Sequence, residues 1–169
     1  MSMRTADWVP LTTILANLVI VAGIPLFVFS HYHAQARDRA ALSISTFDTY
    51  QGGGGEEARR RLVAALWDYP QVFRLEALPL SDYRRFLTLL ADQNRSIVVD
   101  LSTLDHWMRI ARECEDVGGC DAAANARLFG AVAQGVHCVF SPVYIEWRDL
   151  YAIDDLGDNL AYYSIADQC

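Results

Sequence analysis

The longest apolar stretch of the chain lies near its N-terminal end, from Trp8 to Ser30, and holds no charged side chain over 23 residues. As a helix it would extend about 34 Å, enough to cross a bilayer hydrocarbon core of roughly 30 Å. Trp8 at one end and Phe29 and Tyr32 at the other suit the two membrane interfaces, where aromatic side chains are enriched. The pattern predicts one transmembrane helix over residues 8–30, after a short tail of residues 1–7.

A cleaved signal peptide is the alternative interpretation. Such peptides have an apolar region of about 7–15 residues, a basic start and a small-residue cleavage site. Here the apolar stretch is longer, the start carries only Arg4 with Asp7 near it, and Phe27–Ser30 make a poor cleavage site. We therefore expect a helix that stays in the membrane.

One face of this helix is mostly small or polar. Its members follow helical spacing and are Thr13, Ala16, Asn17, Ile20 and Gly23. Membrane helices associate through close packing and hydrogen bonds, which small and polar residues supply. Asn17 either bonds to its own helix or faces a partner, and we favour a face that docks on another membrane helix.

Two histidines, His31 and His33, follow the apolar stretch directly. Histidine can ligate a haem or a pigment. Single-pass helices that do so carry the histidine well inside the apolar stretch, whereas these two lie at the level of the lipid headgroups. We therefore predict no cofactor.

The helical pattern continues through residues 31–51, which we interpret as a stalk, and stops at four glycines, residues 52–55. No strand precedes these glycines and no phosphate-binding pattern surrounds them, so they are expected to form a flexible joint.

Residues 56–153 have the spacing of a helical domain, and the chain as a whole is predicted to be all-α. Glu56–Tyr69 forms a helix that ends at Pro70, with an apolar face made of Leu62, Val63, Leu66 and Trp67. Ser81 caps the next helix, whose inward residues are Tyr83, Phe86, Leu87 and Leu90.

The run Ser96–Leu101 is β-like in composition but has no partner strand, so we expect the following helix to begin at Ser102 or Thr103. Asp121 then caps a long helix that Pro142 breaks, and the two long helices make an αα-hairpin. Residues 154–169 form an acidic tail that packs on the domain or stays loose.

The net charge of −7 argues against nucleic-acid binding and against electrostatic attraction to anionic lipid. All 14 basic side chains are arginine, which is typical of a GC-rich bacterial genome. Arg59, Arg60 and Arg61 form a basic cluster, either a solvated face paired with Glu56 and Glu57 or a contact with lipid headgroups.

The side of the bacterial inner membrane on which the domain lies is less strongly indicated. Arg37 and Arg39 follow the apolar stretch and Arg4 precedes it, so the positive-inside rule favours the cytoplasm by one arginine. A periplasmic domain is the alternative, because an oxidising compartment would allow disulfides among the four cysteines: Cys114, Cys120, Cys138 and Cys169. The pairs Cys114–Cys120 and Cys138–Cys169 are one of three connectivities. Their spacing does not suit zinc, so no metal site is predicted.

No catalytic constellation is evident. Asp105 and His106 are neighbours on a predicted helix and point about 100° apart, so neither can orient the other. We expect Asp105 to pair with Arg109, four residues on. Glu113, Glu115 and Asp116 gather acids at a helix end, which is either a solvated end opposite Arg109 and Arg112 or a cation-binding spot.

The layout resembles an uncharacterised group of bacterial single-pass membrane proteins with an N-terminal transmembrane helix and a helical domain of unknown function. The resemblance rests on a short N-terminus, a basic stalk and the hairpin residues, which are Leu104, Ile110, Gly119, Asp121, Arg127, Phe129, Gly130, Pro142 and Arg148. It implies a fold and a topology only, and the cysteine pattern departs from that of the group.

The sequence therefore predicts a non-catalytic accessory subunit that docks on integral membrane subunits of a larger bacterial complex, with an energy-transducing (photosynthetic or respiratory) complex as the suggested host. Its other partner is the lipid bilayer. The alternative is a free-standing membrane-anchored sensor or regulatory module.

Overall fold

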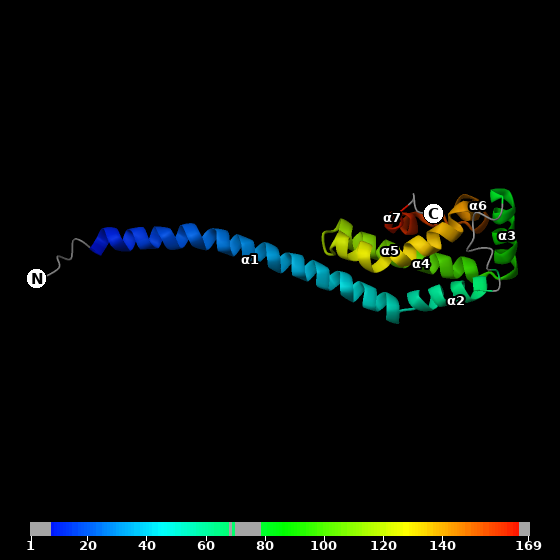
Figure 1. The fold of residues 1–169 in the computed structure, drawn as a ribbon, viewed down its shortest axis with the longest axis horizontal. Coiled ribbons are helices and arrows are strands. Elements are labelled where there is room, and N and C mark those ends of the chain that lie inside the picture. Colours follow the sequence, from blue (N-terminus) through cyan, green and yellow to red (C-terminus); the bar gives the residue numbers. More distant parts are fainter. Residues whose placement is uncertain (1–7, 68, 70–78, 166–169) are drawn as a thin grey trace, which may run out of the picture. The chain divides into compact units, whose positions relative to one another are not determined.

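The computed structural model describes residues 8–67, 69 and 79–165, with side chains from Ile24 onward. Over these ranges the secondary structure is helical, without a strand, which confirms the all-α prediction (Figure 1). The elements are α1 (Trp8–Gly52), α2 (Gly55–Trp67), α3 (Leu80–Gln93), α4 (Ser96–Asp116), α5 (Ala122–Phe140), the 3₁₀ turn η4 (Ser141–Val143), α6 (Tyr144–Tyr151) and α7 (Asp158–Tyr163).

The chain divides into two compact units, Met1–Asp38 and Arg39–Cys169. Helix α1 runs without interruption from Trp8 to Gly52, with Pro25 inside it, and contributes to both units. Pro25 has no N–H to donate, so it removes one backbone hydrogen bond of the helix.

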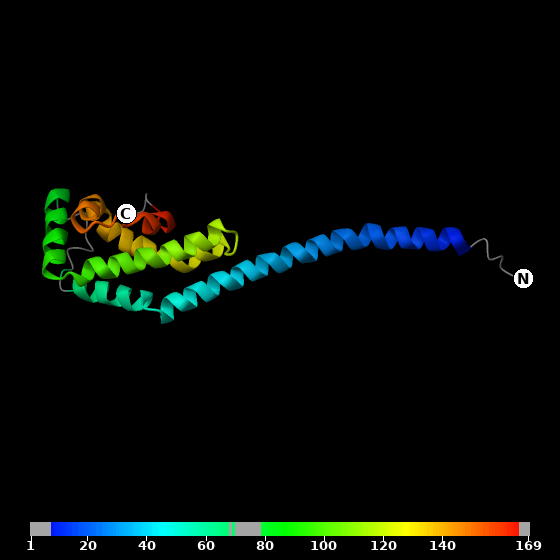
Figure 2. The ribbon, with the colours of Figure 1, turned by 180° about the vertical axis from the view of Figure 1, so that it is seen from behind.

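Helix α4 is central to the second unit, because α2, α5 and α7 all contact it (Figures 1 and 2). Its inward residues recur at helical spacing and are buried: Ile97, Val98, Leu101, Leu104, Met108 and Ala111. This face packs into a core that also includes Tyr83, Leu87, Phe129, Phe140, Trp147 and Leu160.

Helix α4 begins at Ser96, so the predicted start at Ser102 or Thr103 is wrong. The β-branched residues after Ser96 hid a helical period, in which Ile97 and Leu101 lie four apart on the buried face. The Asn94 side chain marks the start, because its Oδ1 accepts from both the backbone nitrogen and the Oγ of Ser96, at 3.3 and 2.7 Å.

The boundaries of α5 are as predicted. Asp121 is its N-cap, and its Oδ1 accepts a hydrogen bond from the backbone nitrogen of Ala124 at 2.7 Å. The helix ends at Phe140, and Pro142 lies in the 3₁₀ turn that follows. Proline interrupts the helix because it has no N–H to donate and its ring clashes with the preceding turn.

Helix α2 buries a narrower face than the sequence suggested. Leu62 and Leu66 are 2% and 3% exposed, whereas Val63 and Trp67 are 39% and 74% exposed. The helix packs on α4 along one stripe of residues four apart, and Val63 and Trp67 belong to the adjacent stripe. It also ends at Trp67, two residues before the predicted Tyr69.

The glycines between α1 and α2 form a closely packed turn. A Cβ atom on Gly55 would lie 2.2 Å from Cδ2 of Tyr50, and one on Gly53 would lie 2.6 Å from the carbonyl oxygen of Thr49. Gly54 has a φ of +96°, which favours glycine. These glycines therefore allow close approach of neighbouring groups, a steric role that the sequence did not reveal.

The first part of the acidic tail packs on the domain. Leu156 and Leu160 are fully buried and Tyr163 is 7% exposed, where α7 contacts α4 and α5. The segment was expected either to pack on the domain or to stay loose, and it packs as far as Tyr163. Residues 166–169 lie outside the described part.

One stretch among the described side chains, Ala122–Tyr151, is long and apolar enough to cross a membrane by length and composition. It comprises α5, the 3₁₀ turn and α6. Phe129, Phe140 and Trp147 within it are at most 1% exposed and belong to the core of the second unit. Of the most apolar part of this stretch, 33% is buried in the core.

Candidate functional site

The described part of the first unit exposes large apolar side chains on every side of α1. Ile24, Leu26, Phe27 and Phe29 are 60–71% exposed, and Val28 between them is 44% exposed. Successive residues of a helix point about 100° apart, so this run covers the whole circumference. The described residues of this run therefore present no polar face.

The predicted interface anchors Phe29 and Tyr32 are 64% and 68% exposed on α1. His33 packs edge-on against Phe29 at 4.2 Å between ring centroids, and Nε2 of His31 lies 3.1 Å from the amide nitrogen of Gln35. Both histidines thus contact their own helix. The side chains of Trp8 and of the predicted docking face (Thr13, Ala16, Asn17, Ile20 and Gly23) lie outside the described residues.

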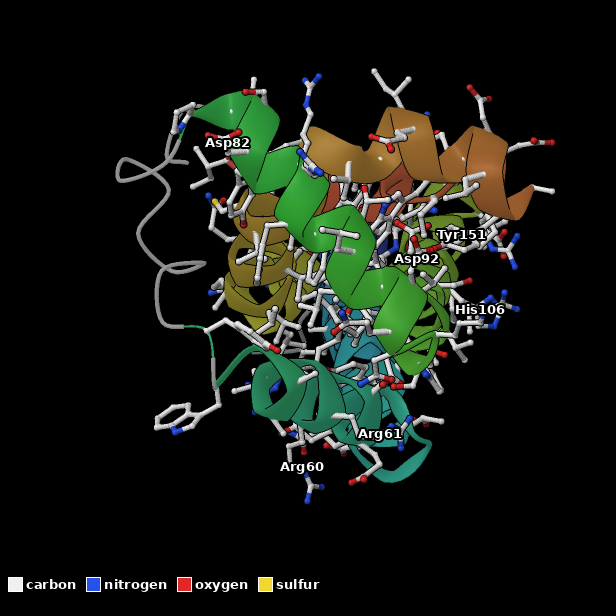
Figure 3. All side chains as sticks on the ribbon, turned by 90° about the vertical axis from the view of Figure 1, so that its right-hand side faces the viewer. Arg60, Arg61, Asp82, Asp92, His106 and Tyr151 are labelled. Atoms are coloured by element: carbon white, nitrogen blue, oxygen red, sulfur yellow. A yellow bond between two sulfur atoms is a disulfide. The ribbon has the colours of Figure 1, made fainter. Side chains whose placement is uncertain are left out.

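The arginine cluster on α2 is engaged in ion pairs. Arg59 binds Glu56 through two hydrogen bonds of 2.8 and 2.6 Å. Arg61 donates to the buried carboxylate of Asp100 on α4, at 2.6 Å from its Nη2 atom. Arg60 is the most exposed of the three, at 64% against 37% for Arg59 and 50% for Arg61, and its side chain extends away from the domain in Figure 3. Arg61 therefore joins α2 to α4, and Arg59 and Arg60 pair with acids of α2 itself, as in the paired-face interpretation.

Two of the cysteines are joined across the turn between α4 and α5, as a Cys114–Cys120 disulfide. Cys138 is also disulfide-bonded, and Cys169, its partner in the predicted pairing, lies outside the described residues. The backbone nitrogen of Asp121, next to the disulfide, donates to the buried Oγ of Ser43 on α1 at 3.0 Å. The disulfide-bonded turn therefore holds the last turns of α1.

Asp105 does not pair with Arg109, and that expectation is wrong. Its carboxylate is buried and accepts three hydrogen bonds from the start of α7: from the backbone nitrogens of Asn159 and Leu160, at 3.1 and 3.0 Å, and from Nδ2 of Asn159, at 3.0 Å. Burial raises the pKa of Asp105, although these donors oppose the shift. Arg109 points to the surface instead.

The acids at the C-terminal end of α4 have separate roles. Glu115 accepts from Asn125 and from the hydroxyls of Tyr162 and Tyr163, so it joins α4, α5 and α7. Glu113 lies 3.8 Å from Arg109. Among the described side chains, no group of three or more His, Cys, Asp or Glu residues could hold a metal ion. The geometry fits the solvated and paired alternative better than a cation site.

A cavity of about 430 Å³ lies between α4 and the segment Ile153–Leu156. Its polar lining comes from Ser102, Thr103, Asp105, His106, Arg109 and Asp155. Sequence reasoning placed Asp105 and His106 on adjacent faces of one helix and saw no site there. The missing wall comes from residues some fifty positions later, for which the sequence offers no local signal.

No protein-family model matches this chain, and comparison with curated proteins and with solved structures likewise finds no significant match.

Proposed function

We propose that this protein is a single-pass membrane subunit that docks on a larger bacterial membrane complex and contributes contacts rather than catalysis. The observation that carries the proposal is the apolar surface around α1 from Ile24 to Phe29, which has no polar face to turn toward water. It continues an uncharged stretch that begins at Trp8. A helix of this kind is stable in a bilayer and insoluble outside it.

Docking is assigned to the small and polar face of the membrane segment, which Asn17 and Gly23 bound on either side. In lipid, such faces provide the close packing and the hydrogen bonds that hold helices together. The acids of α4 in the helical domain have structural partners, which fits a role without catalysis. Asp105 and Glu115 both accept hydrogen bonds from residues of α7. In this proposal, α4 and α5 form the predicted αα-hairpin, joined across their turn by a disulfide.

The disulfides favour the periplasmic alternative for the domain over the cytoplasmic one. Disulfides persist in oxidising compartments and are rare where thiols are kept reduced. The positive-inside preference for the cytoplasm depends on a margin of one arginine. We therefore place the N-terminus in the cytoplasm and the helical domain in the periplasm.

Thiol counting tests this placement. Protein extracted from membranes and denatured with an alkylating agent present should show no reactive thiol until a reductant is added. Reduction of the Cys114–Cys120 bond is expected to lower the free energy of unfolding by about 2 kcal/mol. The reason is that the bond restricts the unfolded chain, by an amount that is modest for so short a loop. Four thiols that react without reductant would place the domain in the cytoplasm.

Native-gel migration after mild detergent extraction tests the docking role, with mass spectrometry identifying the proteins in the band. We expect a large complex for the natural chain and its loss in an Asn17→Leu, Gly23→Leu double variant, which removes both polar and small contacts. Ala22→Leu, about 140° from Asn17 and 100° from Gly23 around a helix, is the matched control and should leave the complex intact. Migration of the natural chain as a monomer would refute the proposal.

A further inference from the structure

The cavity beside α4 presents hydrogen-bond donors at its mouth. Arg109 donates one N–H to Nδ1 of His106 at 2.8 Å. Because a guanidinium cannot accept a hydrogen bond, His106 must accept through Nδ1, and its Nε2 then carries the proton. The carboxylates nearest to Arg109, on Glu113 and Asp155, lie at 3.8 and 3.9 Å, too far for a hydrogen bond.

The same cavity also has an accessible apolar lining. Val99, which is 62% exposed, and the half-buried Ile153 line it above the buried side chains of Val98 and Leu156. Asp105 also lines the cavity, but its carboxylate already accepts three hydrogen bonds from the start of α7, which leaves little acceptor capacity for a ligand. The volume of about 430 Å³ lies in the range of small-molecule sites, roughly 300–1,000 Å³.

The charged groups at the mouth have opposite signs and come from opposite walls. Arg109 belongs to α4, and Asp155 belongs to the segment after α6. Both are about half exposed, with 45% and 55% of their side chains accessible. A guanidinium matches a carboxylate through two parallel hydrogen bonds, and a carboxylate attracts an ammonium group.

We propose that this cavity binds a small aliphatic α-amino acid, with its carboxylate on Arg109, its ammonium group on Asp155 and its side chain against Val99 and Ile153. On binding, Arg109 and Asp155 would each exchange their 3.9 Å contact with one another for a shorter contact with the ligand. This inference goes beyond the docking role and does not depend on it, since docking rests on α1. A failed binding experiment therefore leaves the docking proposal standing.

Isothermal titration calorimetry on the full-length chain in detergent tests the ligand class with three probes of similar size. Leucine carries both charged groups, 4-methylpentanoate lacks the ammonium group, and leucinamide lacks the carboxylate. We expect leucine to bind best and leucinamide at least tenfold more weakly. Absence of leucine binding, or equal binding of leucine and leucinamide, would overturn the proposal.

Two variants then assign the roles. Arg109→Met should weaken leucine binding at least tenfold, while Arg127→Met, which removes an exposed arginine on α5, should leave it unchanged. Asp155→Asn should weaken the binding of leucine but not that of 4-methylpentanoate, which has no ammonium group. A variant that had lost its structure would bind both ligands more weakly. Unchanged leucine affinity in the folded Arg109→Met protein would refute the site.

Discussion

Replacing Gly55 with alanine is expected to lower the free energy of unfolding of the helical unit by about 3 kcal/mol, at the upper end of the usual cost of overpacking. The added Cβ would lie 2.2 Å from Cδ2 of Tyr50 and 2.9 Å from Cδ1 of Trp107. Tyr50 is fully buried, so its ring has no solvent to move into. Urea unfolding followed by tryptophan fluorescence measures the effect.

Gly52→Ala is the matched control, because nothing lies within 4 Å of a Cβ at that position. It should leave stability unchanged or raise it by about 0.4–1 kcal/mol, since alanine restricts the unfolded chain more than glycine does. If the two variants behaved alike, the glycines would serve flexibility, as the sequence suggested, and the steric explanation would be wrong.

Asp105→Ala should be equally damaging, with a loss of about 3 kcal/mol. It leaves the backbone nitrogens of Asn159 and Leu160 and the Asn159 amide without their acceptor, and each buried unsatisfied group costs about 1–3 kcal/mol. Release of α7 partly relieves that cost. Hydrogen exchange should therefore show faster exchange at Leu160, with exchange in α2 as the internal reference. Full protection of α7 in the variant would contradict this role.

The same carboxyl predicts a pH dependence. Its pKa is raised in the folded state above the ordinary value of about 3.9, so the folded protein holds this proton more tightly than the unfolded chain does. The stabilisation that comes from this tighter proton binding is fully present at pH values below the ordinary pKa of aspartate. It is lost as the pH rises through the raised pKa of Asp105. Asp155, whose charge also raises the pKa of Asp105, contributes to the effect. In Asp105→Asn, urea midpoints measured across this range should lose that component, and an unchanged profile would assign the dependence to other groups.

Local signals in the sequence predicted much of the fold. Asp121 capped α5 and Pro142 ended it because both act through the backbone of their own segment. The start of α4 was also encoded locally, in Asn94 and in the spacing of Ile97 and Leu101, but β-branched composition obscured it. Propensity is a weak guide where tertiary packing decides.

The buried acids could not be placed from sequence. Asp100 lies in a run of β-like composition and Asp105 looks like a surface residue of a helix. Their partners, Arg61 and Asn159, lie 39 and 54 positions away. Only a folded chain brings such groups together. One partial signal was present: both acids stand between apolar residues at helical spacing, on the face that α4 buries.

The hydrogen bond between Ser43 and Asp121 also bears on where a fragment that contains the helical unit has to begin, because it ties the last turns of α1 to that unit. Phe47 and Tyr50, further along α1, pack against Phe129 at 5.2 and 5.6 Å between ring centroids. A fragment that began at Glu56 would lose these side chains and leave Phe129 uncovered. A water-soluble fragment should therefore begin at Arg39, where the second compact unit starts, in the middle of a continuous helix.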